Sequence, residues 1–252
     1  MRKTCLILTA VILFLSFTAP AFASPSSGFP VYEGPGCATP EDAVRLYLEG
    51  IQNEDLGKML SAFAIETCVV RFDYTGQLRR IRSYIPVSST GHPSVSNLFT
   101  AMNIESRKQE IVNAIKFQLV MFHLTDYDPV ISTMFMSDDL DAEIAAFVKH
   151  FEDNLGTLAL RDLELVGFIP PNQLSEMYDG EKNQEQLVSL AEICGADELR
   201  SVAALFTVDG KGYYLCCDAL QYGDQWYLHK LGGSISSLLL IDQWAGGITP
   251  AP

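Results

Sequence analysis

The side chains in this sequence best suited to acid–base chemistry are its histidines: His92, His123, His150 and His229. No two of them have the i, i+4 spacing of a helix, and no His-Glu-x-x-His motif is present, so the sequence does not indicate a zinc site. His123 is followed by Asp126 and Asp128, and a carboxylate beside an imidazole can orient a general base. The structural alternative is a histidine at the negative end of a helix, with an Asp-rich turn before Pro129.

A second pair of candidates, Asp218 and His229, falls on two neighbouring strands predicted near the C-terminus. Because side chains alternate along a strand, one face of the first strand carries Tyr214, Cys216, Asp218 and Leu220. In the same way, one face of the next strand carries Tyr227, His229 and Leu231. Whether both sets face the same side depends on the strand register, which the sequence does not fix. If they do, Asp218 and His229 can pair. The alternative is a solvent-facing polar pair on an edge strand.

Other patterns that resemble functional motifs have structural interpretations. The acids Asp138, Asp139, Asp141 and Glu143 lack the glycine and distal glutamate of an EF-hand loop, and acids stabilise the first turn of a helix. The sequence has no Gly-x-Ser-x-Gly elbow, no phosphate-binding glycine loop and no dinucleotide fingerprint. We therefore predict no metal and no cofactor.

The first residues have the pattern of a cleaved secretory signal peptide. Arg2 and Lys3 precede an apolar run from Leu6 to Phe17 that is too short to span a bilayer, and Ala21-Phe22-Ala23 forms a small-x-small cleavage site. We expect residues 1–23 to be removed, Ser24 to become the N-terminus, and the product to be secreted or held in the cell envelope.

Cleavage at that site leaves an odd number of cysteines, so at least one thiol stays unpaired within a monomer. These cysteines are Cys37, Cys68, Cys194, Cys216 and Cys217. Export permits disulfides, but the spacing fixes no pairing and matches no metal template. We interpret them as core residues with one or two bridges, and we expect Cys216 and Cys217 on opposite faces of a strand.

Charge restricts the partners of this 252-residue chain, whose formal net charge is −14. An acidic surface repels phosphate backbones and anionic membranes. No segment after the signal peptide reaches about 18 uninterrupted apolar residues. We therefore expect no nucleic-acid partner and no membrane insertion after cleavage, and a small molecule or a protein as the partner.

Apolar spacing and turn residues predict a flexible lead-in over residues 24–38 and one α+β domain over residues 39–252. Thr39 is suited to cap a first helix that begins at Pro40 and ends before Asn53-Glu54-Asp55. Strand-like alternation is seen from Thr67 to Tyr74. The other predicted helices cover 56–63, 95–122, 137–156 and 184–194, and the other predicted strands cover 158–168, 202–208, 213–220 and 225–231. The last three strands form an antiparallel meander, and helices followed by a meander indicate the α+β class.

Two pieces of the chain resemble the NTF2-like superfamily, a cone-shaped α+β fold. The first is the opening helix pair from Thr39 to Phe63, with its Pro-Glu start and its Asn53-Glu54-Asp55-Leu56 break. The second is the closing Gly223-Asp224-Gln225-Trp226-Tyr227-Leu228, which is similar to that family's turn and Trp-containing final strand. The block from Val95 to Phe151 exceeds the simple cone and is interpreted as an elaborated third helix with an insertion. The resemblance implies N-terminal helices packed on a curved antiparallel sheet.

In such a cone the concave face of the sheet lines the pocket, which would make three aromatic residues candidates for ligand binding: Tyr214, Trp226 and Tyr227. The catalytic candidates are His229, Asp218 and His123. The first hypothesis is an exported, non-enzymatic domain that binds a small ligand or a protein partner. The alternative is an NTF2-like hydrolase or isomerase with a His/Asp site in the cone.

Overall fold

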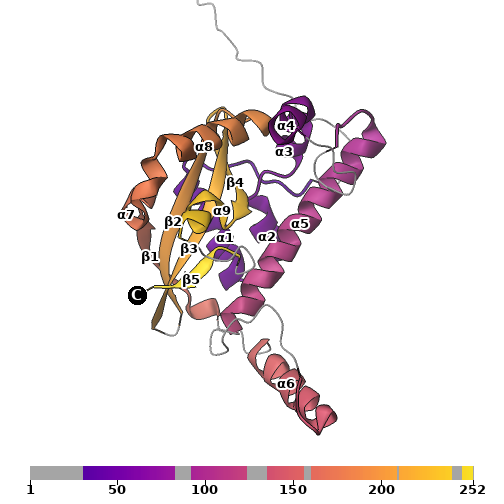
Figure 1. Ribbon diagram of the computed structural model, residues 1–252, viewed down its shortest axis with the longest axis vertical. Coiled ribbons are helices and arrows are strands. Elements are labelled where there is room, and N and C mark those ends of the chain that lie inside the picture. Colours follow the sequence, from indigo (N-terminus) through magenta and orange to yellow (C-terminus); the bar gives the residue numbers. More distant parts are fainter. Residues whose placement is uncertain are drawn as a thin grey trace, which may run out of the picture. The chain divides into compact units, whose positions relative to one another are not determined.

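The computed structural model describes residues 31–82, 92–123, 135–155, 160–208, 210–239 and 246–251. Every described residue belongs to one compact unit, from Val31 to Pro252. This unit has the predicted α+β class: helices pack on a curved, open antiparallel sheet (Figure 1).

The sheet contains the predicted C-terminal meander. Its strands run in the order β1-β2-β3-β4, with every pair antiparallel, and β5 pairs with the beginning of β3. Their bounds are β1 Glu164–Ile169, β2 Glu198–Val208, β3 Lys211–Tyr222, β4 Gln225–Leu231 and β5 Ile248–Pro250. The strand predicted over residues 158–168 corresponds to β1, which begins only at Glu164. Leu160–Asp162 form a 3-10 turn, and residues 156–159 lie outside the described residues.

The helices agree with most of the sequence prediction. They are α1 Pro40–Gln52, α2 Leu56–Ser61, α3 Glu66–Arg71, α4 Tyr74–Ile81, α5 Asn97–His123, α6 Leu140–Leu155, α7 Pro171–Leu174, α8 Glu181–Ile193 and α9 Gly233–Leu238. The start of α1 has the predicted cap, because Thr39 Oγ1 accepts a hydrogen bond of 3.1 Å from the Asp42 amide and Pro40 occupies the first turn. No helix in the described part of the chain is long and apolar enough to cross a membrane.

Both faces of the sheet are covered by helices. On one face, α1 packs against β2, β3 and β4, and on the other, α7, α8 and α9 cover β2 and β3 (Figure 1). Successive residues of β3 therefore enter different cores: Cys217 packs in the α1 core, whereas Cys216 packs with Ile235 of α9. This confirms the prediction that Cys216 and Cys217 lie on opposite faces of one strand.

The predicted strand from Thr67 to Tyr74 is wrong, because this segment forms α3 and the start of α4. Adjacent Cys68 and Val69 are both buried while Val70 is 57% exposed, a pattern that fits a helix and not an alternating strand. The cause lies far away in the sequence. The Glu33 carboxylate accepts hydrogen bonds of 2.8 Å and 3.0 Å from the amides of Ile65 and Thr67, and so caps the first turn of α3.

The predicted flexible lead-in over 24–38 is described only from Val31 onward, and there it is bonded to the domain. Besides the bonds of Glu33, the Gly34 amide donates to the Ser61 carbonyl at 3.0 Å, and Cys37 exchanges backbone hydrogen bonds with Trp226 of β4. This part of the lead-in is therefore ordered by contacts that its Ser/Pro/Gly-rich composition does not indicate.

Candidate functional site

The elements around the outer edge of β4 line a partly open cavity of about 250 Å³. Helix α3 packs against α5, and α4 packs against α8, next to this strand (Figure 1). The cavity lining includes polar side chains from all five elements and the segments that flank them: Cys68, Arg80, Arg107, Cys194, His229 and Lys230. The cavity is therefore built by tertiary packing and not by a local motif.

A bulge in β4 directs two successive polar residues into this cavity. The register of the β3–β4 pair changes between Asp218 and Ala219, because Ala219 lies opposite Leu228 whereas Asp218 lies opposite Lys230. A bulge leaves an extra residue without a partner and breaks the alternation of side chains. His229 and Lys230 can thus both line the cavity, while Leu228 and Leu231 both remain in the α1 core.

Three potential ligand or nucleophile atoms meet at the wall of the cavity. The side-chain donor atoms of Cys68, Cys194 and His229 all lie within 4.8 Å of one another. Cys68 belongs to α3, Cys194 is the C-cap of α8, and His229 lies on the bulge of β4. Both thiols are almost fully buried, with exposed fractions of 6% for Cys68 and 4% for Cys194. The cavity is therefore where a small molecule would meet these thiols.

Arg107 of α5 lies beside this cluster and is itself buried. Its Nη1 donates to a Glu110 carboxylate oxygen at 3.1 Å, and its Nη2 donates to the His229 backbone carbonyl and approaches His229 Nδ1 at 3.1 Å. Its Nε has no hydrogen-bond partner among the described residues. Buried polar atoms are almost always paired, so this guanidinium has capacity for one more acceptor.

These neighbours act on the thiol of Cys68. Its pKa lies well below its ordinary value, because the Cys194 thiol donates a hydrogen bond to it and His229 and Arg107 also stabilise the thiolate, against the opposing effect of burial. The pKa of Cys194 moves in the opposite direction, since its proton is held in the bond to Cys68 and burial disfavours a second thiolate. Of the two thiols, Cys68 therefore ionises more readily and Cys194 keeps its proton more tightly.

Two thiols and an imidazole are also the ligand types of zinc sites that keep an open position. A zinc-bound histidine donates its other ring N–H to an acceptor, but here the group that faces Nδ1 of His229 is the Arg107 guanidinium, which can only donate. Nδ1 is therefore placed to accept a hydrogen bond from Arg107. The donor set fits zinc in type, whereas the orientation of the imidazole fits free thiols better.

The predicted partner of His229, Asp218, makes different contacts. Asp218 is fully buried and accepts a hydrogen bond of 2.7 Å from Ser201 Oγ and two of 3.1 Å from the Ser234 amide at the start of α9. Burial raises its pKa, while the charge of Lys230 and these hydrogen bonds oppose that effect. The carboxylate thus links β3 to β2 and to α9.

The predicted ligand-binding aromatics do not line the cavity at β4. Tyr214 is half-buried beside β5, Trp226 packs in the α1 core with Arg200 5.1 Å from its ring centre, and Tyr227 packs in the α8 core. Helix α5 extends to His123, but the side chain of His123 and the following Asp126 and Asp128 lie outside the described part.

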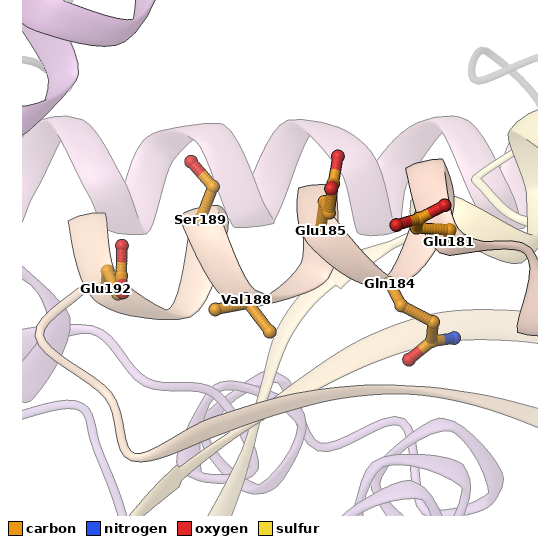
Figure 2. A pocket seen from close by; sticks show the side chains of 6 residues that line it. All are labelled: Glu181, Gln184, Glu185, Val188, Ser189 and Glu192. Atoms are coloured by element: carbon orange, nitrogen blue, oxygen red, sulfur yellow. The ribbon is translucent and has the colours of Figure 1, made fainter.

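A second depression, of about 430 Å³, is larger than the cavity at β4 but is not an enclosed site. Its lining residues all project from a single helix, α8 (Figure 2): Glu181, Gln184, Glu185, Val188, Ser189 and Glu192. With one wall and several carboxylates, it is the solvated outer face of this helix. The cavity at β4 is therefore the better candidate site.

Comparisons with known proteins add little to this geometry. No family model matches the chain, and no curated protein matches it. A crystal structure of a cystatin-like protein from Ruminococcus gnavus ATCC 29149 is similar, with 15% sequence identity and a TM-score of 0.46. The match covers 84% of this chain and 44% of that protein, so the chain spans less than half of that relative's length.

Sequence analysis selected His229 but not the residues around it. Cys68 was assigned to a strand, Cys194 was treated as a core residue, and Arg107 had no motif to mark it. The sequence feature that could have indicated Arg107 is its position in the middle of the predicted helix, among the apolar residues Ile104, Ile111 and Ile115. These three isoleucines are buried in α5.

Proposed function

We propose that this protein is an exported domain that binds a small anionic ligand in the cavity at β4. The observation that carries the proposal is Arg107, a buried guanidinium at the cavity whose Nε lacks a partner among the described residues. Arginine is suited to hold carboxylate, sulfate or phosphate groups because it presents several donors in one plane. An anionic group that reached this guanidinium from the cavity would give Nε an acceptor.

The charges around the cavity support an anion as the ligand. Arg80, Arg107 and Lys230 contribute positive charge, and Glu110 is the only carboxylate among its lining residues. The positive side chains stay in excess even when the Cys68 thiol is ionised. This local excess is opposite in sign to the chain as a whole, with its net charge of −14. A focused positive site on an acidic protein attracts small anions, whereas the surrounding surface repels large polyanions. The volume of about 250 Å³ limits the ligand to a small molecule.

Membership of the NTF2-like superfamily and export are parts of the same proposal. The helix pair 39–63 and the Trp-containing strand β4 support the family, and the N-terminal pattern of residues 1–23 supports export. The alternative hydrolase or isomerase, which would use Asp218 with His229, has less support because the hydrogen bonds of Asp218 run to Ser201 and Ser234. A binding role requires neither residue as an acid or base.

The test is the thermal unfolding midpoint in the presence of small carboxylates, sulfate and phosphate, each compared with a neutral amide or alcohol of similar size. A ligand that binds only the folded state raises the free energy of unfolding and, with it, the unfolding midpoint. At a hundredfold excess over the Kd of the ligand, the free energy of unfolding rises by about 2.7 kcal/mol. We expect at least one anion to stabilise the protein and its neutral analogue to have no effect. The absence of any anion-selective stabilisation would contradict the proposal.

Charge variants locate the effect. Arg80→Gln and Lys230→Gln each remove a positive charge from the cavity lining, and we expect each to weaken the stabilising anion by about tenfold, or about 1.4 kcal/mol. Arg161→Gln is the matched control, because it removes the same charge from an exposed residue that does not line the cavity. Equal losses in all three variants would indicate a general charge effect and not a site.

A further inference from the structure

We propose that Cys68 and Cys194 form a reversible thiol–disulfide pair that exchanges with small anionic disulfides entering the cavity at β4. The inference rests on the proposed anion site and names the chemistry of its ligand. It goes beyond a binding role, because it assigns a nucleophile, a resolving thiol and a class of co-reactant.

The geometry supplies the parts that such an exchange requires. The two sulfur atoms lie within 4.8 Å of each other and within the same distance of a His229 ring nitrogen, at the wall of an open cavity. The sulfurs come from α3 and from the end of α8, so a bond between them would join two separate elements. Closing a disulfide requires the sulfurs to approach to about 2 Å.

The two cysteines have different roles because their surroundings differ. Cys68 Sγ lies within 4.8 Å of Cys194 Sγ and of a His229 ring nitrogen, and these groups and the Arg107 charge lower its pKa, so we assign Cys68 as the attacking atom. The Cys68 neighbour and burial raise the pKa of Cys194, so we assign Cys194 as the resolving thiol. The Tyr222 hydroxyl donates to the Cys194 backbone carbonyl at 3.0 Å and fixes the position of the second residue.

The exchange balances in two steps. The Cys68 thiolate attacks one sulfur of the small disulfide, forms a mixed disulfide and expels the other half as a thiolate. Cys194 then loses its proton to solvent and attacks Cys68 Sγ. This step expels the second half as a thiolate and leaves a Cys68–Cys194 disulfide. The protein dithiol is oxidised by two electrons, and the small disulfide is reduced to two thiols.

The cavity selects the co-reactant by size and by charge. Cys68 and Cys194 are only 6% and 4% exposed, so the disulfide of a folded protein cannot reach them, whereas a small disulfide can enter a space of about 250 Å³. Arg80, Arg107 and Lys230 favour one that carries carboxylates. Under the proposed export, the pair would also lie in a compartment where disulfides form and persist.

The experiment compares three disulfides of similar size and different charge on the purified, reduced protein: anionic dithiodiglycolate, neutral hydroxyethyl disulfide and cationic cystamine. Mass spectrometry follows the mixed and internal disulfides with time and maps them to peptides. In the wild type we expect two small thiols released per chain and a Cys68–Cys194 linked peptide. We expect the anionic reagent to react at least about tenfold faster than the neutral one, since electrostatic focusing in a cleft raises association rates by that much or more.

Variants separate the two roles. Cys194→Ser should stop the reaction at a mixed disulfide on Cys68 with one thiol released, and Cys68→Ser should abolish the fast reaction. Cys37→Ser is the matched control: Cys37 is half-buried and does not line the cavity, so its loss should leave rate and stoichiometry unchanged. If a variant does not fold, the number of thiols released by the wild type and its peptide map still test the proposal.

Several results would overturn the proposal. One is a mixed disulfide that forms on Cys37 as fast as on Cys68. Another is a Cys68–Cys194 bond that is present after purification and resists reduction in the folded protein, which would make it a structural bridge. A third is one tightly bound zinc per chain that protects both thiols, which would make the cluster a metal site.

The inference and the proposed function fail in different ways. If Cys68→Ser is still stabilised by small anions but the wild type exchanges no disulfide, the redox inference is wrong and the anion site stands. If Cys68 and Cys194 exchange with all three reagents at one rate, and no anion stabilises the protein, the redox pair stands without the proposed anion site.

Discussion

Cys68 shows how one residue acquires reactivity from groups that are distant in the sequence. Its thiolate is stabilised by Cys194 from the end of α8, by His229 from the β4 bulge and by Arg107 from α5. Each of these residues has an ordinary structural interpretation when its own segment is considered alone. The reactive thiol is therefore a product of tertiary packing, and no local motif could have predicted it.

The first prediction concerns Arg107→Lys. A lysine keeps the charge, but as a compact point charge on a flexible stem it cannot reproduce the planar contacts to the His229 carbonyl and Nδ1. We expect the pKa of Cys68 to rise, so that the pH profile of its alkylation shifts to higher pH. The measurement is the iodoacetamide rate at Cys68 between about pH 5 and pH 9. An unshifted profile in a folded variant would show that Arg107 does not act on the thiolate.

The second prediction concerns Asp218, whose pKa is raised above its ordinary value of 3.8 in the folded state. At pH values between the pKa of Asp218 in the unfolded chain and its higher pKa in the folded protein, the folded state binds more protons than the unfolded state. The contribution of Asp218 to the free energy of unfolding therefore falls as the pH rises through this range. Asp218→Asn removes the titration and can keep an oxygen acceptor for Ser201 and Ser234. We expect the variant to gain stability relative to wild type as the pH rises from about 3 to about 7.

Urea unfolding of both proteins across that range checks the second prediction. The quantity to compare is the free energy of unfolding of the variant minus that of the wild type at each pH. A difference that stays constant, or that falls as the pH rises, would show that the Asp218 pKa is not raised by folding.

At the scale of elements, sequence patterns predicted most helices and the whole meander. Thr39 caps α1 and Pro40 begins it as predicted, and β2, β3 and β4 lie where their apolar runs and turn residues predict strands, because these signals depend on near neighbours. Two features depend on distant contacts and were not predicted. Glu33 caps α3 where Cys68 and Val70 suggested a strand, and the bulge opposite Asp218 turns both His229 and Lys230 toward one cavity.

The third prediction concerns the start of α9, where Gly233 has φ +75° and lies against Asp218. A Cβ on Gly233 would lie 2.4 Å from Asp218 Cγ, so an alanine must displace the carboxylate that holds α9 to β3. We expect Gly233→Ala to lower the free energy of unfolding by about 1–2 kcal/mol for the left-handed backbone and by about 1–3 kcal/mol more for the clash.

Gly210→Ala is the matched control for this variant. Gly210 has nearly the same φ, +73°, but a Cβ there meets no atom within 4 Å. Gly210→Ala should lower the free energy of unfolding only by the cost of the left-handed backbone, about 1–2 kcal/mol. Equal losses in the two variants, measured by urea unfolding, would show that Asp218 does not restrict the space at Gly233.

At the scale of the whole molecule, the acidic chain and its basic cavity give a consistent physical account. The net charge of −14 repels nucleic acid and anionic membranes, while the cavity at β4 gathers positive side chains from α4, α5 and β4. From this net charge the sequence predicts repulsion of large polyanions. It could not locate the cavity, because Arg80, Arg107 and Lys230 approach one another only after the helices pack beside β4.

Export is the fourth prediction and belongs to this scale. When the full chain is expressed in a bacterium, we expect the product outside the cytoplasm to begin at Ser24, as shown by N-terminal sequencing or intact mass. A product that stays in the cytoplasm and retains residues 1–23 would contradict the proposed export and would place the thiols in a reducing compartment.

The central claim is that the cavity at β4 holds a small anion against Arg107. The most direct measurement is a crystal structure of the protein with the anion that most raises its unfolding midpoint. The account predicts density for the anion inside the cavity, with an oxygen within hydrogen-bond distance of Arg107 Nε and near Cys68. An anion bound elsewhere, with Arg107 Nε bonded to a protein acceptor or to water alone, would contradict it.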